Sequence, residues 1–206
     1  MSIWAIVPVK PFSEAKSRLK GVLTVPERAA LGREFLMHTL QVLTQVPGIG
    51  QVLVISRDTA ALTLAREYQA RTVTESGAPD LNTALRRATE AVVGLGAHAL
   101  LILPTDLPLL SVEAVRQIVA EPGVEPAVVI APDRRQTGTN ALFVRPPGLI
   151  EYAFGRNSFH LHRAWAERAG ASVRVLQSTA IELDLDVPED WALYQAQRQA
   201  AVSSHP

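Results

Sequence analysis

Short runs of apolar residues recur along the chain and alternate with longer, amphipathic segments. An apolar run without polar alternation is typical of a strand that is covered on both faces of a sheet. The clearest run, residues 99–103, leads directly into Pro104, Thr105 and Asp106. The predicted strands are residues 3–9, 51–56, 70–73, 99–103, 127–131, 141–144 and 173–176.

Helical patterns fill most of the intervals between these runs. The first begins at Thr24, which can cap a helix; Pro26 suits an early helical position, and Glu27 lies three residues after the cap. Strand, helix and strand in succession make a right-handed crossover between parallel strands, so an α/β fold is expected. The other predicted helices are residues 59–69, one beginning at Asp80 or Asn82 and ending near Val93, 112–120, one capped by Asn157 or Ser158, and 188–199.

Composition narrows the class of protein. The chain has 206 residues, of which 48% are hydrophobic and 19% charged, as in an ordinary globular protein. No repeat or long linker interrupts it, so we expect one domain over residues 1–206 with a frayed tail at 199–206. The 20 basic and 20 acidic residues balance, so neither nucleic acid nor a membrane surface is an expected partner.

Cysteine is absent, which excludes disulfides, thiolate metal sites and cysteine nucleophiles. This fits a cytoplasmic location, and the first ten residues do not form a signal peptide. The apolar runs are also far shorter than the roughly 18 residues that a membrane-spanning helix needs.

Asp106 is the first candidate for chemistry, because it stands at the carboxyl end of a buried strand. Open α/β sheets bind their ligands at that edge. Asp106 could therefore be a ligand of a divalent metal beside a phosphate-bearing substrate. It could also cap the helix that follows, although Ser111 is better placed for capping.

A basic loop follows the first predicted strand. Lys10, Lys16, Arg18 and Lys20 lie there, with Glu14 as the one acid among them. Backbone amides and cations at this edge of a sheet favour a polyphosphate. A solvated basic loop without a ligand would have the same composition.

Two carboxylates near the end of the chain share one direction. Asp184 and Asp186 alternate with Leu183, Leu185 and Val187, so in an extended backbone both point to the same side. Like charges placed together repel unless a cation lies between them, which makes a metal site a physically economical interpretation.

Other polar groups are less specific. The turn at residues 137–140 (T-G-T-N) could present amides to a carboxylate or phosphate, or could be a plain hairpin loop. Asp80 and Asn82 suit a nucleobase but equally suit a helix start. His160 and His162 cannot chelate one metal from a helix, so we expect one to pack and the other to be solvated.

Three segments together carry a family resemblance: A-I-V-P-V-K-P-F-S-E-A-K-S-R-L at the start, L-P-T-D-L-P-L-L in the middle and D-L-D-V-P-E-D near the end. The chain resembles the phosphoenolpyruvate / 2-phospho-L-lactate guanylyltransferase family, which serves the biosynthesis of a deazaflavin redox coenzyme. The first segment is specific to that family, and the other two are shared with molybdenum-cofactor nucleotidyltransferases. The resemblance implies a three-layer α/β/α sandwich with a mostly parallel sheet, nucleotide-diphosphosugar-transferase-like and thus Rossmann-like.

The resemblance also implies a reaction and its residues. GMP would pass from GTP to the phosphate of a phosphorylated three-carbon acid, with release of pyrophosphate and dependence on Mg²⁺. An acceptor phosphate is already ionised, so neither histidine is needed as a base. The resemblance implies that Mg²⁺ is bound by Asp106, Asp184 and Asp186, and that the acid is bound by Thr139 (or its neighbours Thr137 or Asn140), Gly155 and Ser158. It implies that the triphosphate is bound by Lys10, Lys16 and Arg18, and the guanosine by Asp80 and Asn82. The implied catalytic groups are Asp106, Lys16 and Arg18.

Alternatives remain open. The segment P-D-L-N lacks the glycine that the family pattern has before Leu81. A related nucleotidyltransferase acting on molybdopterin or a sugar phosphate would carry a glycine-rich loop in place of the basic one. A receiver-like module with Asp106 as phosphoacceptor would need an acidic pair after the first strand. The sequence does not choose among phosphoenolpyruvate, 2-phospho-L-lactate and 3-phosphoglycerate, and a homodimer is the ordinary expectation.

Overall fold

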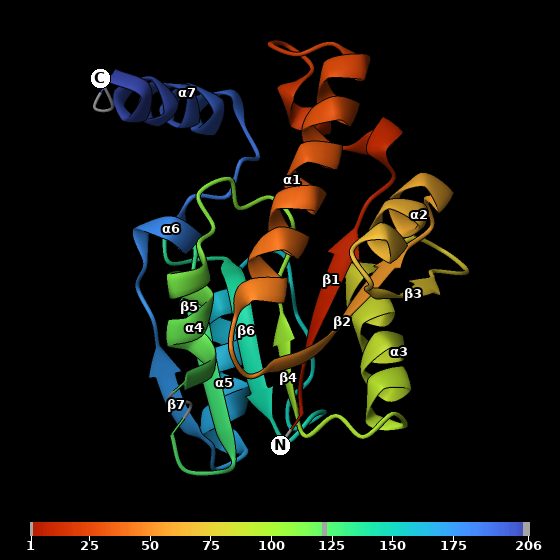
Figure 1. The fold of residues 1–206 in the computed structure, drawn as a ribbon. Helices are drawn as coiled ribbons and strands as arrows, with labels where there is room; N and C mark the ends of the chain where they lie inside the picture. The colour runs from red at the N-terminus through yellow and green to blue at the C-terminus, as the bar shows by residue number, and fades with distance from the viewer. Residues whose placement is uncertain (1, 121–122, 204–206) are drawn as a thin grey trace.

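A computed structural model describes residues 2–120 and 123–203, which form one seven-stranded sheet flanked by helices (Figure 1). The strand order is β3-β2-β1-β4-β6-β5-β7. The strands are β1 (Ile3–Val9), β2 (Ile49–Ser56), β3 (Arg71–Thr74), β4 (Ala99–Ile102), β5 (Ala127–Pro132), β6 (Thr139–Arg145) and β7 (Ser172–Val175). The helices are α1 (Val25–Gln45), α2 (Thr59–Glu67), α3 (Leu81–Val93), α4 (Val112–Ala120), α5 (Ser158–Arg168), α6 (Thr179–Glu182) and α7 (Pro188–Ser203), with short 3₁₀ turns η1 (Phe12–Glu14) and η2 (Ser17–Leu19).

The sheet is parallel except for one strand. β1 pairs in parallel with β2 and β4, and β5 with β7, whereas β6 runs antiparallel to both of its neighbours. The start of β6 therefore lies at the same edge as the carboxyl ends of β4 and β5. The prediction of a mostly parallel α/β sheet is confirmed.

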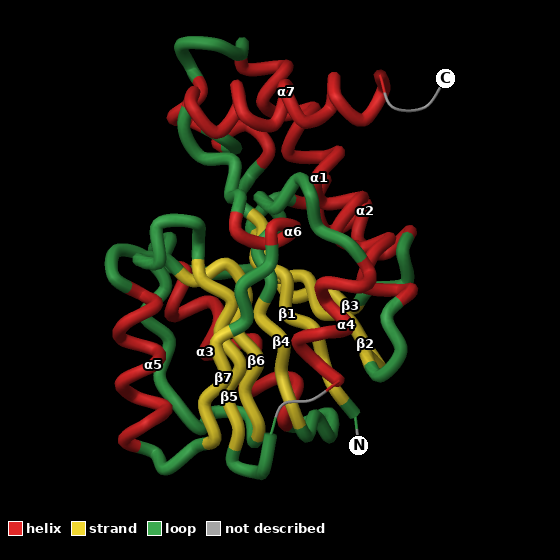
Figure 2. Tube along the Cα trace, turned by 90° about the vertical axis from the view of Figure 1, so that its left-hand side faces the viewer, coloured by secondary structure: helices red, strands yellow, loops and turns green. Residues whose placement is uncertain are grey.

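Side chains alternate along each strand and fill two separate cores. On one face, Ala5 and Val7 pack in a cluster with residues of α1, α2 and α4. On the other face, Trp4 and Ile6 pack with residues of α3 and α5. Figure 2 shows α4 and α5 on opposite sides of the sheet. The predicted three-layer sandwich is thus confirmed, and its central strands are apolar runs because both of their faces are covered.

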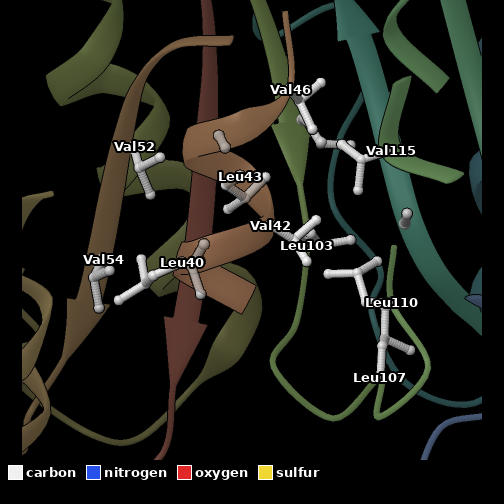
Figure 3. Close-up of a cluster of buried hydrophobic side chains, with 14 of the residues drawn as sticks. Leu40, Val42, Leu43, Val46, Val52, Val54, Leu103, Leu107, Leu110 and Val115 are labelled. Atoms are coloured by element: carbon white, nitrogen blue, oxygen red, sulfur yellow. The ribbon is translucent and has the colours of Figure 1, made fainter. Parts of the chain in front are cut away.

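The loop that follows Asp106 is anchored in the first core. Leu107 is 1% exposed and Leu110 2% exposed, and both belong to the cluster that includes Leu43 of α1 and Val115 of α4 (Figure 3). Leu107 and Leu110 fix the backbone that follows Asp106, and β4 fixes the backbone that precedes it.

Three local features differ from the predictions. Thr139 and Asn140 begin β6 instead of forming a turn, because they pair with the end of β5. A short helix, α6, precedes the two late aspartates, and its four residues were too few to give a helical pattern. The last helix was predicted to end at residue 199 but continues to Ser203, and the rest of the predicted frayed tail, 204–206, lies outside the described residues.

α7 lies at the end of the molecule toward which β1 points (Figure 1). Its Tyr194 packs with Phe35 of α1 and with Leu185, in a third small cluster. Of the helices in the described part of the chain, none is long and apolar enough to cross a membrane.

Candidate active site

Asp106 and the segment that carries Asp184 and Asp186 meet at the carboxyl edge of the sheet. The backbone N–H of Leu185 donates a hydrogen bond of 2.9 Å to the carbonyl oxygen of Asp106. Leu185 itself is fully buried, so its side chain holds the segment against the body of the protein. The structure therefore brings together three aspartates that are far apart in the sequence.

Two neighbouring carboxylates affect the ionisation of Asp184. Burial and the nearby carboxylates of Asp106 and Asp186 raise the pKa of Asp184 to about 6. At pH 7 the ionised form of Asp184 therefore has a higher free energy than a carboxylate in water, and a bound cation would lower that free energy.

Two cations of the basic loop already contact these carboxylates. Lys16 Nζ lies 3.5 Å from Asp106 Oδ2, and the lysine side chain is only 9% exposed. Lys16 has a left-handed backbone with φ of 50°, which is uncommon for a residue with a side chain. Arg18 Nη1 lies 3.0 Å from Asp186 Oδ2, in a more exposed position. Lys10 is exposed and forms no ion pair with any other described residue.

Across residues 2–120 and 123–203, no three acidic or histidine side chains are already arranged around one point where a metal ion could sit. Asp106 and Asp186 face cations instead. The oxygen donors nevertheless have the chemistry that Mg²⁺ prefers, because hard divalent cations take carboxylate oxygens and keep several waters.

Thr139 and Ser158 lie in a second, more enclosed part of the site. Thr139 is 6% exposed at the start of β6, and Ser158 is 1% exposed at the start of α5. Gly155 precedes α5 with φ of +132°, a conformation that side chains disfavour. Asn140 connects this part to the aspartates, since its amide donates to the carbonyl of Ile181 at 2.8 Å, at the approach to Asp184.

His162 lies at the centre of the second part and was not assigned a role from the sequence. Its side chain is fully buried, whereas His160 is exposed, so the expectation that one histidine packs and the other is solvated is confirmed. Nδ1 lies 3.0 Å from the Thr139 hydroxyl, and Nε2 lies 3.0 Å from the backbone nitrogen of Ala153. Burial lowers the pKa of His162 to about 4, so the ring is neutral at pH 7.

The two residues expected near guanosine have partners within the protein. Asp80 caps α3 by accepting from the Thr83 N–H at 2.7 Å, and bonds from Thr83 lower the pKa of Asp80. Asn82 accepts from the Phe154 N–H at 2.8 Å and donates to the Phe154 carbonyl at 3.2 Å. Capping, the alternative considered for Asp80, is what the structure shows; Asn82 fastens the loop that carries Gly155 to α3.

Asp190 is a further residue that sequence reasoning did not assign. It is 5% exposed, and its Oδ2 accepts from the backbone N–H groups of Asp186 and Val187 at 3.2 and 3.0 Å. Its Oδ1 accepts from Arg134 at 2.8 Å. Asp190 therefore fixes the backbone at Asp186; its place in D-L-D-V-P-E-D was the signal that could have revealed it.

The fold is similar to that of solved nucleotidyltransferase structures. A protein from Desulfovibrio desulfuricans G20 named as a nucleotide-diphospho-sugar transferase is similar in structure, with a TM-score of 0.76, 19% identity, and coverage of 96% of this chain and 89% of that one. A CMP:2-keto-3-deoxy-manno-octonic acid synthetase has a TM-score of 0.66 at 13% identity, with 98% and 100% coverage. At such identities the likeness concerns the fold alone.

The family follows from the sequence comparisons. The family described as "Guanylyl transferase CofC like" matches residues 3–194, and the chain belongs to it. The phosphoenolpyruvate guanylyltransferase of Rubrobacter xylanophilus is 41% identical over 196 residues, 95% of each chain. The 2-phospho-L-lactate guanylyltransferase of Methanothermobacter thermautotrophicus is 34% identical over 190 residues, 92% of this chain and 82% of the relative.

Proposed function

We propose that the protein transfers GMP from GTP to the phosphate of phosphoenolpyruvate or 2-phospho-L-lactate, releases pyrophosphate, and thereby serves the biosynthesis of a deazaflavin coenzyme. The observation that carries the proposal is the meeting of Asp106, Asp184 and Asp186 beside Lys16 and Arg18. Such a cluster suits the binding of two phosphate-bearing substrates. Relatives that are named for the two acids support the choice of acceptor.

The residues would act by orientation and charge. The acceptor's phosphate oxygen attacks the α-phosphorus of GTP in line, and the pyrophosphate oxygen leaves with the bonding electron pair. The attacking oxygen is already ionised, so no side chain must remove a proton. Lys16 and Arg18 neutralise the charge that develops on the phosphates, and Lys10 contributes from the rim of the basic loop.

Asp106, Asp184 and Asp186 fit Mg²⁺ by the chemistry of their oxygen donors. When bound, Mg²⁺ would supply neutralisation of phosphate charge and alignment of the two substrates. Lys16 and Arg18, which pair with two of these carboxylates, would then be free to turn toward phosphate oxygens.

Thr139, Gly155 and Ser158 would bind the three-carbon acid. Ser158 lies in the first turn of α5, where backbone N–H groups and the helix dipole favour an anion. Asp80 and Asn82 would act on the guanosine mainly by fixing the start of α3 and the loop beside it, because their polar atoms already have protein partners.

The test is product formation by the purified protein with GTP and Mg²⁺, while phosphoenolpyruvate, 2-phospho-L-lactate and 3-phosphoglycerate compete as acceptors. We expect a guanylylated acid by mass spectrometry, together with pyrophosphate. Asp106→Asn should lower the rate by about 10²–10³-fold or more, the effect of losing a group that stabilises transition-state charge. Glu113→Gln, which alters an exposed carboxylate on α4, is the control. Unchanged activity in Asp106→Asn would refute the carboxylate assignment.

The proposal includes one domain over residues 1–206, action in the cytoplasm, where GTP and phosphoenolpyruvate are available, and assembly as a homodimer. Light scattering during size-exclusion chromatography tests the assembly, and an elution mass of one chain would contradict it.

A further inference from the structure

His162 connects two segments that the proposed function places around the three-carbon acid. One ring nitrogen faces Thr139 at the start of β6, and the other faces Ala153, two residues before Gly155. The ring also contacts Phe154 edge-on, with centroids 4.9 Å apart. A fully buried imidazole with one partner at each nitrogen has a defined orientation.

The two partners determine the tautomer. The backbone N–H of Ala153 can only donate, so Nε2 must be the unprotonated, accepting nitrogen. A neutral imidazole then carries its proton on Nδ1, and Nδ1–H donates to the hydroxyl oxygen of Thr139. The reverse tautomer would place two N–H groups against each other.

This arrangement determines what the Thr139 hydroxyl can do. Its oxygen accepts from His162, so its own proton is directed elsewhere, and among the described residues no acceptor for that proton is present. A hydroxyl that accepts one hydrogen bond becomes a better donor in the next, because bonds in a chain polarise one another. Thr139 is therefore prepared to donate to an anion.

We propose that His162 is a positioning residue, which holds the Thr139 hydroxyl as a hydrogen-bond donor to the carboxylate or phosphate of the three-carbon acid. The inference rests on the proposed function. Through Ala153, the same ring also holds the loop that leads to Gly155, and Asn82 holds the next residue, Phe154. The acid would thus be bound by groups whose donor and acceptor roles are set before it arrives.

Nitrogen-15 NMR of the histidine ring tests the tautomer in the wild-type protein without any assay of activity. We expect a protonated, pyrrole-type signal for Nδ1 and an unprotonated, pyridine-type signal for Nε2 of His162 at pH 7. A proton on Nε2, or on both nitrogens, would overturn the inference.

Two substitutions separate the donor from the acceptor. In His162→Gln, the side-chain amide lies near the position of Nε2, so it can still accept from Ala153 but no longer donates to Thr139. In His162→Asn, the amide lies near Nδ1 and keeps the donor toward Thr139. We expect His162→Gln to raise KM for the acid about tenfold, the effect of one weakened hydrogen bond to a charged group, with KM for GTP unchanged. His162→Asn should restore most of that loss, and His160→Gln, at an exposed position, is the matched control.

Coupling to Thr139 provides the decisive comparison. Thr139→Val should raise KM for the acid by a similar factor, and the double variant His162→Gln/Thr139→Val should show no further rise, because both changes remove one interaction. Thermal unfolding of each variant shows whether it folds. Equal acid KM values for His162→Gln and His160→Gln in an active protein would overturn the positioning role alone, whereas an inactive wild type would overturn the proposed function and the positioning role together.

Discussion

The two halves of the site differ in how their polar groups are satisfied. Around Thr139, Ser158 and His162, polar groups are buried and the ring of His162 has a protein partner on each side. Around Asp184, three carboxylates crowd one another and the pKa of Asp184 rises to about 6. In the first half the protein orients the polar groups and leaves one donor, the Thr139 hydroxyl, open for a ligand. The second half keeps negative charge that Lys16 and Arg18 offset only in part.

This difference shows where a ligand contributes most to stability. The half around His162 offers a ligand an oriented donor, the Thr139 hydroxyl, and has no crowded like charges for a ligand to relieve. The carboxylate half gains whenever a cation or a cation-bound phosphate arrives, so stability is sacrificed there for binding. Removing a crowded carboxylate and removing a polar group whose hydrogen bonds are all made within the protein should therefore have opposite effects on the free energy of unfolding.

Asp184→Asn should give the largest effect. Removing the crowded carboxylate should lower guanylyl transfer by about 10²–10³-fold or more, because one of the oxygen donors that would hold Mg²⁺ beside the phosphates is lost. The same change should raise Tm at pH 7 by about 2–4 °C, the shift that about 1 kcal/mol gives in a chain of this size. Activity assays and thermal denaturation measure the two effects, with Glu113→Gln as the control for both. A lower Tm in Asp184→Asn would contradict the comparison.

Asp190→Ala should have the opposite effect on stability. It removes a buried carboxylate that accepts from two backbone N–H groups and from Arg134, so we expect unfolding free energy to fall by about 2–3 kcal/mol. Urea denaturation measures the loss. Arg134→Ala should cost less, since that side chain is 35% exposed. A loss from Asp190→Ala no larger than that from Arg134→Ala would show that Asp190 does not fix the Asp186 backbone.

The third expected effect, and the smallest when counted per pH unit, is a dependence of stability on pH. The pKa of His162 is about 4 in the folded protein and 6.5 in the unfolded chain, so the unfolded state binds more protons between these values. Stability from this group is complete above pH 6.5 and is lost as pH falls toward 4, by at most about 1.4 kcal/mol per pH unit.

Asp184 changes stability in the opposite direction over a similar pH range. Because its pKa is raised in the folded protein, the folded state binds more protons than the unfolded state there, and stability rises as pH falls. The measurement is therefore the difference between the wild type and His162→Gln in unfolding free energy at several pH values, with Asp184 present in both. A difference that does not change between pH 6.5 and 4 would refute the assignment of a buried neutral His162.

Much of the fold could be predicted from the sequence because its signals are local. Thr24 and Glu27 form the expected reciprocal cap, and the apolar runs became strands covered on both faces. The start of β6 was missed because Thr139 and Asn140 look like turn residues until the end of β5 is placed beside them. Only tertiary structure shows that pairing.

The site was predicted in part for the same reason. Asp106, Asp184 and Asp186 stand out because charge interrupts apolar sequence in short motifs, and the structure does bring them together. His162 binds the Thr139 hydroxyl and the backbone of Ala153, and Asn82 binds the backbone of Phe154. Backbone groups have no signature in the sequence. A residue that binds backbone atoms many positions away in the sequence can be recognised only from the structure.

The reversed strand β6 has one further consequence. Because β6 begins at the edge where β4 ends, a single stretch from Thr139 to His162 leaves the site, crosses the sheet and returns to it. The groups proposed to bind the acid therefore lie in one continuous segment, residues 139–162. The carboxylates and cations instead come from three separate places in the chain. Exchanging this segment between relatives that use different acceptors should leave the groups that bind the nucleotide unchanged. Chimaeras joined at the two ends of the segment should therefore change the acceptor most readily.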